Sequence, residues 1–325
     1  MNFDEQMKQR VEYIEEVIHR YMPQEYSYQR TIIDAMDYTM SAGGKRIRPM
    51  LMKACFDMFG GTSKVIEPFM AAIEMIHTYS LIHDDLPALD NDDYRRGRKT
   101  AHIVYGEDMA ILAGDGLLNY AFETAGKAFT MIRSEDFANL DEESFNDCVL
   151  MKEKLDACMQ ELRQRRNVEY AMQILTHKPG IYGMIGGQVV DVELTGSVLN
   201  EGQLTYIYEN KTGALIEASM MIGAVLAEVD ASVIEKIAKV AYNIGMAFQI
   251  QDDILDETST FEALGKALHS DEKNGKVTYV TLHGIDEAKE EVKRLSREAI
   301  LILQSFAGDS KFLVDLTEFL IDRKN

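Results

Sequence analysis

FMAAIEMIHTYSLIHDD, residues 69–85, is apolar over most of its circumference when arranged as a helix and ends in two adjacent aspartates. VAYNIGMAFQIQDDILD, residues 240–256, combines the same two features. A helix that is apolar on nearly all sides is surrounded by other helices in the interior of a protein. These two stretches therefore predict an all-α fold built around two central helices, each closed by a group of acidic side chains.

The rest of the chain carries helical rather than strand signals. Its five prolines lie at or near the ends of apolar-periodic runs, and no succession of short alternating segments joined by tight turns is present. No linker is long enough to divide the chain, so residues 1–325 are expected to form a single domain. Residues 134–166 are polar with helical spacing, which predicts a peripheral helical insertion.

Composition narrows the class of protein. The formal net charge is −20, which argues against nucleic acid as a partner because phosphate backbones bind to basic surfaces. The three cysteines form no C-x-x-C pair, which favours a reducing cytoplasm. The first residues lack the apolar core of a signal peptide, and no run of about 18 apolar residues exists to span a membrane. An anionic ligand would need a local cationic cluster or a metal ion.

Two groups of aspartates close the central helices, and their members are Asp84, Asp85, Asp90, Asp252, Asp253 and Asp256. Within the second group, Asp252 and Asp256 are one helical turn apart on the same face, where like charges repel each other. Burial on a mostly apolar helix adds a desolvation cost. Divalent cations would relieve both costs, and carboxylates that leave positions for water and phosphate are typical of magnesium sites. One such group arises easily by chance, but two predict facing walls of one cavity.

Cationic and polar side chains form compact groups, several of them close to the aspartates in the sequence, and they are Lys45, Arg48, Arg95, Arg96, Lys211, Thr212 and Lys266. Arginine forks match phosphate oxygens, although each basic pair taken alone would be an ordinary solvated surface charge. His77 lies two helical turns before Asp84, and Gln249 lies three residues before Asp252, so both could face the cavity. Gln188 is a further candidate, although its neighbouring glycines also suit close helix packing alone.

With these segments in view, the chain resembles the trans-prenyltransferase (polyprenyl synthetase) family, and more narrowly its bacterial farnesyl diphosphate synthases. The matching segments follow the family's order and are GGKRIRP, IHTYSLIHDDLPALDNDDYRRG, GMIGGQVVD, KTGALIEAS, FQIQDDILD, LGK and SDEKNGKVTYVTL. The resemblance implies the isoprenoid synthase fold, with antiparallel helices around a central cavity, and usually a homodimer. It also implies a magnesium-dependent enzyme that acts on isopentenyl and allylic diphosphates.

The resemblance assigns roles to three sets of residues. The expected magnesium ligands are Asp84, Asp90 and Asp252. The allylic diphosphate would be held by Arg95, Lys211, Thr212, Gln249 and Lys266. Isopentenyl diphosphate would be held by Lys45, Arg48, His77 and Arg96. The residues expected to be catalytic are Asp84, Asp85, Asp90, Lys211 and Asp252, with Asp253 and Asp256 as supporting members of the second motif.

The implied reaction depends on electrostatics. Metal ions and cationic side chains stabilise the departing pyrophosphate, an allylic cation forms, and the double bond of isopentenyl diphosphate attacks it. Apolar walls exclude the water that would quench the cation. Tyr79, five residues before Asp84 with Ser80 beside it, would form the floor of the product pocket and stop growth near fifteen carbons. Farnesyl diphosphate is the expected product, and geranylgeranyl diphosphate is the alternative.

Two departures from the family pattern are the length of residues 134–166 and His269, which stands where the family commonly has glycine. Three alternatives remain open. A terpene cyclase would share the first motif but would typically carry Asn/Asp, Ser/Thr and Glu in the second. A non-catalytic partner subunit would generally lose aspartates from one motif. A di-iron bundle, suggested by the Glu-x-x-His spacing after Glu16 and Glu74, leaves both aspartate groups unexplained.

Overall fold

The computed structural model describes residues 2–24, 26–132, 148–258 and 277–322. Lys266 and His269 lie outside these ranges, as do residues 134–147 of the expected insertion, so the boundaries of the insertion and of the domain remain predictions. Within the described ranges the fold is all-α, as the sequence predicts, and the one sheet there is a hairpin of two two-residue strands.

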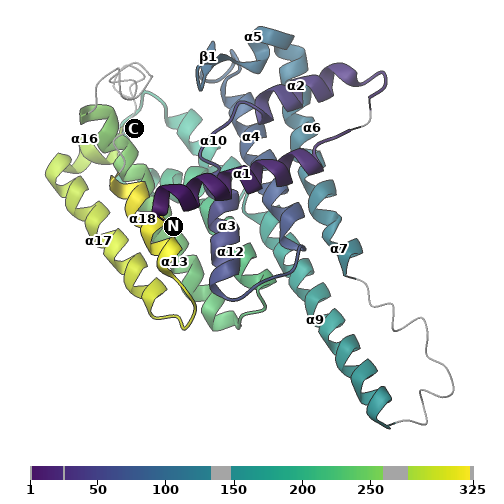
Figure 1. Ribbon diagram of the computed structural model, residues 1–325. Helices are drawn as coiled ribbons and strands as arrows, with labels where there is room; N and C mark the ends of the chain where they lie inside the picture. Colours follow the sequence, from purple (N-terminus) through teal and green to yellow (C-terminus); the bar gives the residue numbers. More distant parts are fainter. Residues whose placement is uncertain (1, 25, 133–147, 259–276, 323–325) are drawn as a thin grey trace.

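The elements of the first half, shown in Figure 1, are α1 Phe3–Tyr21, α2 Arg30–Met40, α3 Ile47–Met58, α4 Ile66–Asp84, β1 Tyr94–Arg95, β2 Arg98–Lys99, α5 Ala101–Tyr105, α6 Glu107–Gly126 and α7 Ala128–Met131. Those of the second half are α9 Cys148–His177, α10 Met184–Leu194, α11 Glu201–Ile207, η2 Tyr208–Gly213, α12 Ala214–Leu226, α13 Ala231–Thr258, α16 Tyr279–His283, α17 Ile285–Gln304 and α18 Lys311–Asp322.

The two central helices are α4 and α13. Helix α4 is buried on almost all sides and packs against α6, α3 and α1, whereas α13 packs against α12 and α17. Helix α4 ends at Asp84, and α13 extends to Thr258, two residues beyond Asp256, so both aspartate groups lie at the carboxyl ends of their helices, as predicted. Ile254 and Leu255 keep a buried apolar face beneath the aspartates of α13. None of the helices in the described ranges is both long and apolar enough to cross a bilayer.

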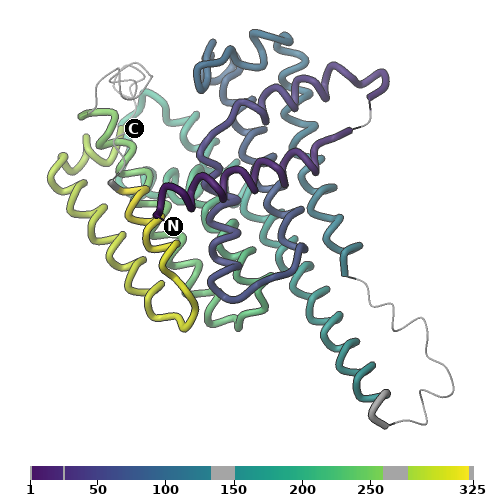
Figure 2. Tube along the Cα trace, in the orientation of Figure 1, coloured from purple at the N-terminus to yellow at the C-terminus, as the bar shows by residue number. Residues whose placement is uncertain are grey.

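Helices from distant parts of the sequence lie side by side in the fold (Figures 1 and 2). The first helix, α1, runs across the front and meets α18, where the ring of Phe3 contacts the rings of Phe312 and Phe319. The first turns of α9 extend away from the body, and Leu155 and Met159 are exposed there. The apolar core itself runs from α1 to α18 and surrounds α4, so the carboxyl end of α4 lies at the edge of a rigid scaffold.

Candidate active site

Asp84 is the last residue of α4 and is half-buried. The backbone amide of Asp90 donates a hydrogen bond of 2.8 Å to the carbonyl of Asp84, so the turn after α4 folds back on the helix end. Burial raises the pKa of Asp84 to about 6, and the charge of Asp90 contributes to this rise, while Lys211 and Arg95 oppose it. An ionised carboxylate held at this cost favours the binding of a cation.

Asp85 is engaged by Arg95. The Nε and Nη2 atoms of Arg95 lie 2.7 and 2.6 Å from Oδ1 of Asp85, whose side chain is buried. The short β1–β2 hairpin carries Arg95, so this pair fixes the guanidinium at the edge of the site. Asp85, which was expected among the catalytic residues, therefore pairs with Arg95 and orients its guanidinium.

The turn η2 carries Lys211 and Thr212. It is a π-helical turn between α11 and α12, and such turns are rare and concentrate at functional sites. A Cβ atom at Gly187 of α10 would lie 2.2 Å from the backbone nitrogen of Lys211, and one at Gly245 of α13 would lie 3.1 Å from the backbone of η2. Glycines at these two positions allow α10 and α13 to clamp the turn from both sides.

Lys211 and Thr212 are held by side chains of α10 and α13. The Nζ atom of Lys211 lies 2.6 Å from Oδ2 of Asp191 on α10. Burial disfavours the charged ammonium, but Asp191 and the aspartates of the first group outweigh burial and raise the pKa of Lys211. The hydroxyl of Thr212 donates a hydrogen bond of 2.9 Å to Oε1 of Gln249 on α13. The turn thus presents a fixed cation to α4 and a polar link to α13.

Two cavities adjoin at this turn. The first, called the cationic chamber, has a volume of about 860 Å³, and its charged lining includes Lys45, Arg48, Arg95, Arg96 and Asp252. The second, called the apolar chamber, has a volume of about 620 Å³, and its lining includes Tyr79, Asp84, Leu118, Met184 and Gln188. The residues that line both chambers are Arg48, His77, Leu81 and Thr212. Asp84 therefore lines one of the two adjoining chambers and Asp252 lines the other, rather than both lining a single cavity.

Arg48 and His77 occupy the boundary between the chambers. Burial and the charge of Arg96 lower the pKa of Arg48 to about 10, so its guanidinium stays charged at neutral pH. Its Nε atom is buried and has no hydrogen-bond partner among the described residues, which is a cost that a bound anion would remove. Burial, and then the surrounding arginines, lower the pKa of His77 well below its ordinary value, so the imidazole is neutral.

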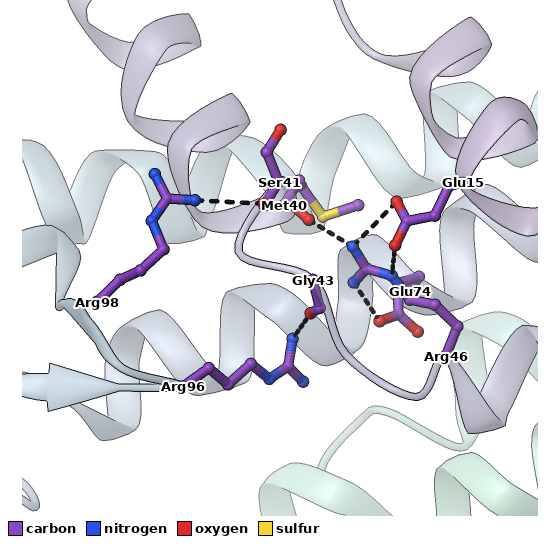
Figure 3. Close-up of polar contacts among 8 residues, drawn as sticks. All are labelled: Glu15, Met40, Ser41, Gly43, Arg46, Glu74, Arg96 and Arg98. Carbon is purple, nitrogen blue, oxygen red and sulfur yellow. Dashed lines mark hydrogen bonds and ion pairs between the residues drawn. The ribbon is translucent and has the colours of Figure 1, made fainter. Parts of the chain in front are cut away.

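The basic side chains of the Gly-Gly-Lys-Arg segment and of Arg48 after it differ in their pairing with carboxylates. Arg46 lies 2.7 Å from carboxylate oxygens of Glu15 and Glu74 and is almost fully buried (Figure 3). It lines the cationic chamber together with Lys45 and Arg48, but its guanidinium is committed to the two carboxylates. Figure 3 also shows Arg96, whose guanidinium donates to the carbonyl of Gly43 from the hairpin side. Arg46 is therefore a structural cation that fixes the loop between α2 and α3.

The three aspartates of the second group face different surroundings. Asp252 is half-buried and lines the cationic chamber. Asp253 is 3% exposed and accepts hydrogen bonds from the Tyr208 hydroxyl and the Tyr279 amide. Asp256 is half-buried one turn beyond Asp252. Of the three, Asp252 is the member that reaches the cavity predicted for it.

Tyr79 and Ser80, the expected product-length residues, both line the apolar chamber. Tyr79 is 6% exposed, and its ring packs edge-on against His83 with ring centroids 5.8 Å apart. Burial and the charge of Asp84 raise the pKa of Tyr79 to about 12, so the phenol is neutral. The hydroxyl of Ser80 donates back to the carbonyl of His77. Of these two side chains, the ring of Tyr79 is therefore the bulky group that lines the chamber.

The donor set suits magnesium. Within the ranges that the structure describes, no three His, Cys, Asp or Glu side chains converge into a ready-made metal cage. Magnesium does not require one, because it keeps several waters and binds through one or two carboxylates together with substrate phosphates. Burial and the nearby charge of Asp90 make it costly to ionise Asp84, and Asp252 lines the adjoining chamber. A bound divalent cation would relieve this cost.

Helix α10 contributes two side chains to the site whose roles the sequence did not predict. Gln188, considered only as a further candidate, donates a hydrogen bond of 2.8 Å to Oδ1 of Asp84. Asp191 was not assigned any role, yet it pairs with Lys211. The two residues are three apart on one helix and therefore share a face, which was a usable signal. Lys266 lies outside the described residues, and its role stays a prediction.

Comparisons with known proteins agree with this site. A statistical model of the polyprenyl synthetase family matches residues 29–311. The geranylgeranyl diphosphate synthase of Cyanophora paradoxa is 38% identical over 98% of this chain and 95% of that protein. The farnesyl diphosphate synthase of Geobacillus stearothermophilus is 40% identical over 79% of this chain and 77% of that protein. A Helicobacter pylori geranyltransferase, complexed with magnesium and isoprenyl diphosphate, has a TM-score of 0.76 and 28% identity over 99% of this chain and 97% of that one.

The family match covers both aspartate groups, the basic segment before α3 and the lysine–threonine turn. The similarity to the solved geranyltransferase extends over almost the whole of both chains, which confirms the isoprenoid synthase fold implied by the sequence. The resemblance noted in the sequence is thus confirmed as well. This chain belongs to the polyprenyl synthetase family and is a prenyltransferase.

Proposed function

We propose that this chain condenses isopentenyl diphosphate with the allylic substrates dimethylallyl and geranyl diphosphate, and that farnesyl diphosphate is its main product. The observation that carries the proposal is the pairing of a cationic chamber with an apolar chamber across a shared wall. A diphosphate needs the first and a growing hydrocarbon chain needs the second. A site for a single polar metabolite would have no use for the apolar chamber.

Magnesium would be held by Asp84, Asp90 and Asp252, since Asp84 lines the apolar chamber, Asp252 lines the cationic chamber, and the backbone of Asp90 is bonded to that of Asp84. When bound, it would neutralise charge on the diphosphate and make pyrophosphate a better leaving group. Gln188 orients one of these carboxylates through its hydrogen bond to Asp84. The protein's own contribution here is to orient Asp84 before any ligand arrives.

The allylic diphosphate would be bound by side chains between the two walls, namely Arg95, Lys211, Thr212 and Gln249, together with Lys266. Two of them are already oriented by carboxylates, Arg95 by Asp85 and Lys211 by Asp191. Donors that are held in place before charge develops stabilise a leaving pyrophosphate without reorganisation. The allylic carbon–oxygen bond then breaks with its electron pair leaving on the pyrophosphate oxygen, and an allylic cation remains.

Isopentenyl diphosphate would be bound by Lys45, Arg48, His77 and Arg96. The buried, unpaired Nε of Arg48 is a donor that suits a phosphate oxygen, and neutral His77 could donate one hydrogen bond without adding charge. The double bond of isopentenyl diphosphate attacks the allylic cation and forms the new carbon–carbon bond. Loss of a proton, taken up by the released pyrophosphate, restores a double bond. Leu81 and Phe248 contribute apolar surface that keeps water from the cation.

The choice of farnesyl diphosphate rests on Tyr79. Its buried ring lines the same chamber as Asp84 and would limit the depth available to the growing chain. Geranylgeranyl diphosphate is the alternative, because several similar proteins carry that name and because Ile185, Val189 and Val192 line the chamber while partly exposed. A chamber that continues along α10 past the tyrosine would accommodate a longer chain.

A homodimer in a cytoplasmic compartment completes the proposal. Ile111 and Leu112 on α6 and Tyr170 on α9 are large apolar side chains with exposed surface, which a second copy of the chain would cover. A non-catalytic partner subunit is the alternative from a different class. The retention of both aspartate groups, with Asp84 and Asp252 on adjoining chambers, favours the enzyme.

The test is a turnover assay of the purified chain with magnesium, labelled isopentenyl diphosphate and dimethylallyl, geranyl or farnesyl diphosphate as primer, followed by product sizing. The expected outcome is a fifteen-carbon product from the first two primers and little extension of the third. Efficient extension of farnesyl diphosphate would replace the product assignment but keep the reaction. Absence of turnover with every primer, in a folded protein, would overturn the enzymatic proposal.

A further inference from the structure

Asp253 lies beside Asp252 in the sequence but points into a different environment. Its side chain is 3% exposed, and its Oδ2 accepts a hydrogen bond from the hydroxyl of Tyr208 and one of 2.8 Å from the backbone amide of Tyr279. Adjacent residues on a helix project about 100° apart. Asp252 therefore reaches the cationic chamber while Asp253 lines a smaller cavity behind η2.

The three residues form a closed arrangement, called here the Tyr208–Asp253–Tyr279 clasp. The amide of Tyr279 lies 3.1 Å from the Tyr208 hydroxyl oxygen, in addition to its bond to Asp253. Tyr208 is itself buried, so each bond is shielded from water. Hydrogen bonds to an ionised carboxylate are shorter and stronger than neutral ones, and burial strengthens them further.

The clasp joins three segments that are distant in sequence. Tyr208 is the first residue of η2, three positions before Lys211. Asp253 follows Asp252 on α13, and Tyr279 is the first residue of α16. The bonds span 45, 26 and 71 positions. They consequently set the position of the lysine–threonine turn relative to the second aspartate group, independently of any ligand.

We propose that Tyr208 and Asp253 are positioning residues that hold Lys211 and Thr212 at a fixed distance from Asp252 and Gln249, and that Asp253 is not a magnesium ligand. The effect on turnover rests on the function proposed above, whereas the clasp itself does not. A shift of about 1 Å in groups that bind the reacting substrate can lower the rate by roughly a hundredfold. A carboxylate committed to the scaffold therefore contributes to catalysis without touching the metal.

The experiment compares four variants of the full-length chain. Tyr208→Phe removes the hydroxyl, Asp253→Asn keeps the shape but removes the charge, and the double variant removes both. Tyr279→Phe is the matched control, because it keeps the backbone amide that enters the clasp and the ring stacked on His283. The measurements are kcat, KM for each substrate, the half-saturating magnesium concentration and amide hydrogen exchange in residues 208–213 and 277–283.

The clasp predicts a specific pattern. Tyr208→Phe and Asp253→Asn each lower kcat about tenfold or more and raise KM for the allylic diphosphate, while KM for isopentenyl diphosphate stays within about twofold. The double variant is about as impaired as either single one, because all three remove the same unit. The half-saturating magnesium concentration stays within about twofold, exchange at the Tyr279 amide accelerates, and Tyr279→Phe behaves like the parent chain.

The opposite pattern overturns the proposal. If Asp253→Asn raises the magnesium requirement about tenfold or more while Tyr208→Phe is silent, Asp253 is a metal ligand. Unchanged amide exchange in Tyr208→Phe would equally remove the clasp. A parent chain that turns over no prenyl diphosphate would refute the proposed function alone, because the exchange measurement reports on the clasp without any substrate.

Discussion

The side-chain amide of Gln188 on α10 donates a hydrogen bond of 2.8 Å to Oδ1 of Asp84 at the end of α4, across 104 positions of sequence. The carbonyl oxygen of the same Gln188 side chain is buried and has no partner among the described residues. The bond restricts the rotation of the Asp84 carboxylate, which lines the apolar chamber. It therefore orients one proposed magnesium ligand from an element outside both aspartate motifs.

Replacing Gln188 with leucine, which keeps the side chain's size, should raise the half-saturating magnesium concentration about tenfold. Partners that orient a metal ligand typically contribute about 10- to 100-fold to metal affinity. The measurement is turnover against magnesium concentration at saturating substrates, with Val198→Leu, an exposed position beyond α10 that lines neither chamber, as the control. An unchanged magnesium requirement in Gln188→Leu would show that Asp84 is oriented without this bond.

Asp84 should make the stability of the metal-free protein depend on pH. Burial raises its pKa to about 6, above the value of about 4 expected in the unfolded chain. The folded state therefore binds more protons between these two values, and the contribution of Asp84 to stability is full below the lower value and is lost as pH rises through about 6.

Asp84→Asn removes this titration, so without magnesium it should be more stable than the parent at about pH 7, by about 1–2 kcal/mol after screening by solvent. Near pH 4 the two proteins should be equally stable, because the aspartate is then protonated in both states. Thermal unfolding in the presence of a chelator at both pH values measures the difference. A difference that is the same at both values would contradict the pKa assignment.

Gly187→Ala should disrupt the lysine–threonine turn. The added Cβ would lie 2.2 Å from the backbone nitrogen of Lys211, so α10 or η2 has to move. Overpacking of this kind typically costs about 1–3 kcal/mol, and the displaced turn should lower kcat about a hundredfold. Gly126→Ala, where a Cβ meets nothing within 4 Å, is the matched control and should keep full activity. Activity in Gly187→Ala equal to that control would exclude a tight clamp.

Glu74→Ala should unfold the protein at a much lower temperature. Arg46 and Glu74 are 2% and 1% exposed, and the pair holds the loop that carries Lys45 and leads into α3, where Arg48 lies. Removing one partner of a buried ion pair costs about 3–5 kcal/mol, because the remaining charge stays buried and only partly compensated. Lys293→Ala, which breaks an exposed ion pair on α17, is the control and should leave the unfolding midpoint unchanged. Equal midpoints in the two variants would refute the structural role of Arg46.

Tyr79→Ala should lengthen the product from fifteen to twenty or more carbons, because it deepens the apolar chamber by the volume of a ring. Loss of a large buried aromatic side chain also costs about 3–5 kcal/mol, so the assay needs a temperature at which the variant is folded. Tyr79→Phe keeps the ring and loses a hydroxyl that has no hydrogen-bond partner among the described residues, so it should keep the fifteen-carbon product. Identical products from both variants would move the chamber floor elsewhere.

Periodicity and residue chemistry were sufficient for part of this site. The apolar circumference of residues 69–85 and 240–256 predicted two buried helices, and both are present. Helix α13 extends to Thr258, two residues beyond Asp256, so its aspartates lie in its last turns as predicted. Neighbouring residues of one type could not be separated by sequence. Arg46 and Arg48 belong to the same basic segment and both line the cationic chamber, yet the guanidinium of Arg46 is paired with Glu15 and Glu74, whereas Nε of Arg48 has no partner among the described residues.

The helical class and the available chemical groups could be predicted from the amino-acid sequence, because helix formation follows local spacing and because aspartate, lysine and arginine carry their chemistry wherever they lie. Which of these groups face the two chambers depends on tertiary packing. Asp252 reaches the cationic chamber while Asp253 is bonded to Tyr208, and Lys211 is paired with Asp191. Those assignments depend on how α10, η2 and α13 pack together, and contacts between such distant segments leave no periodic signal in the chain.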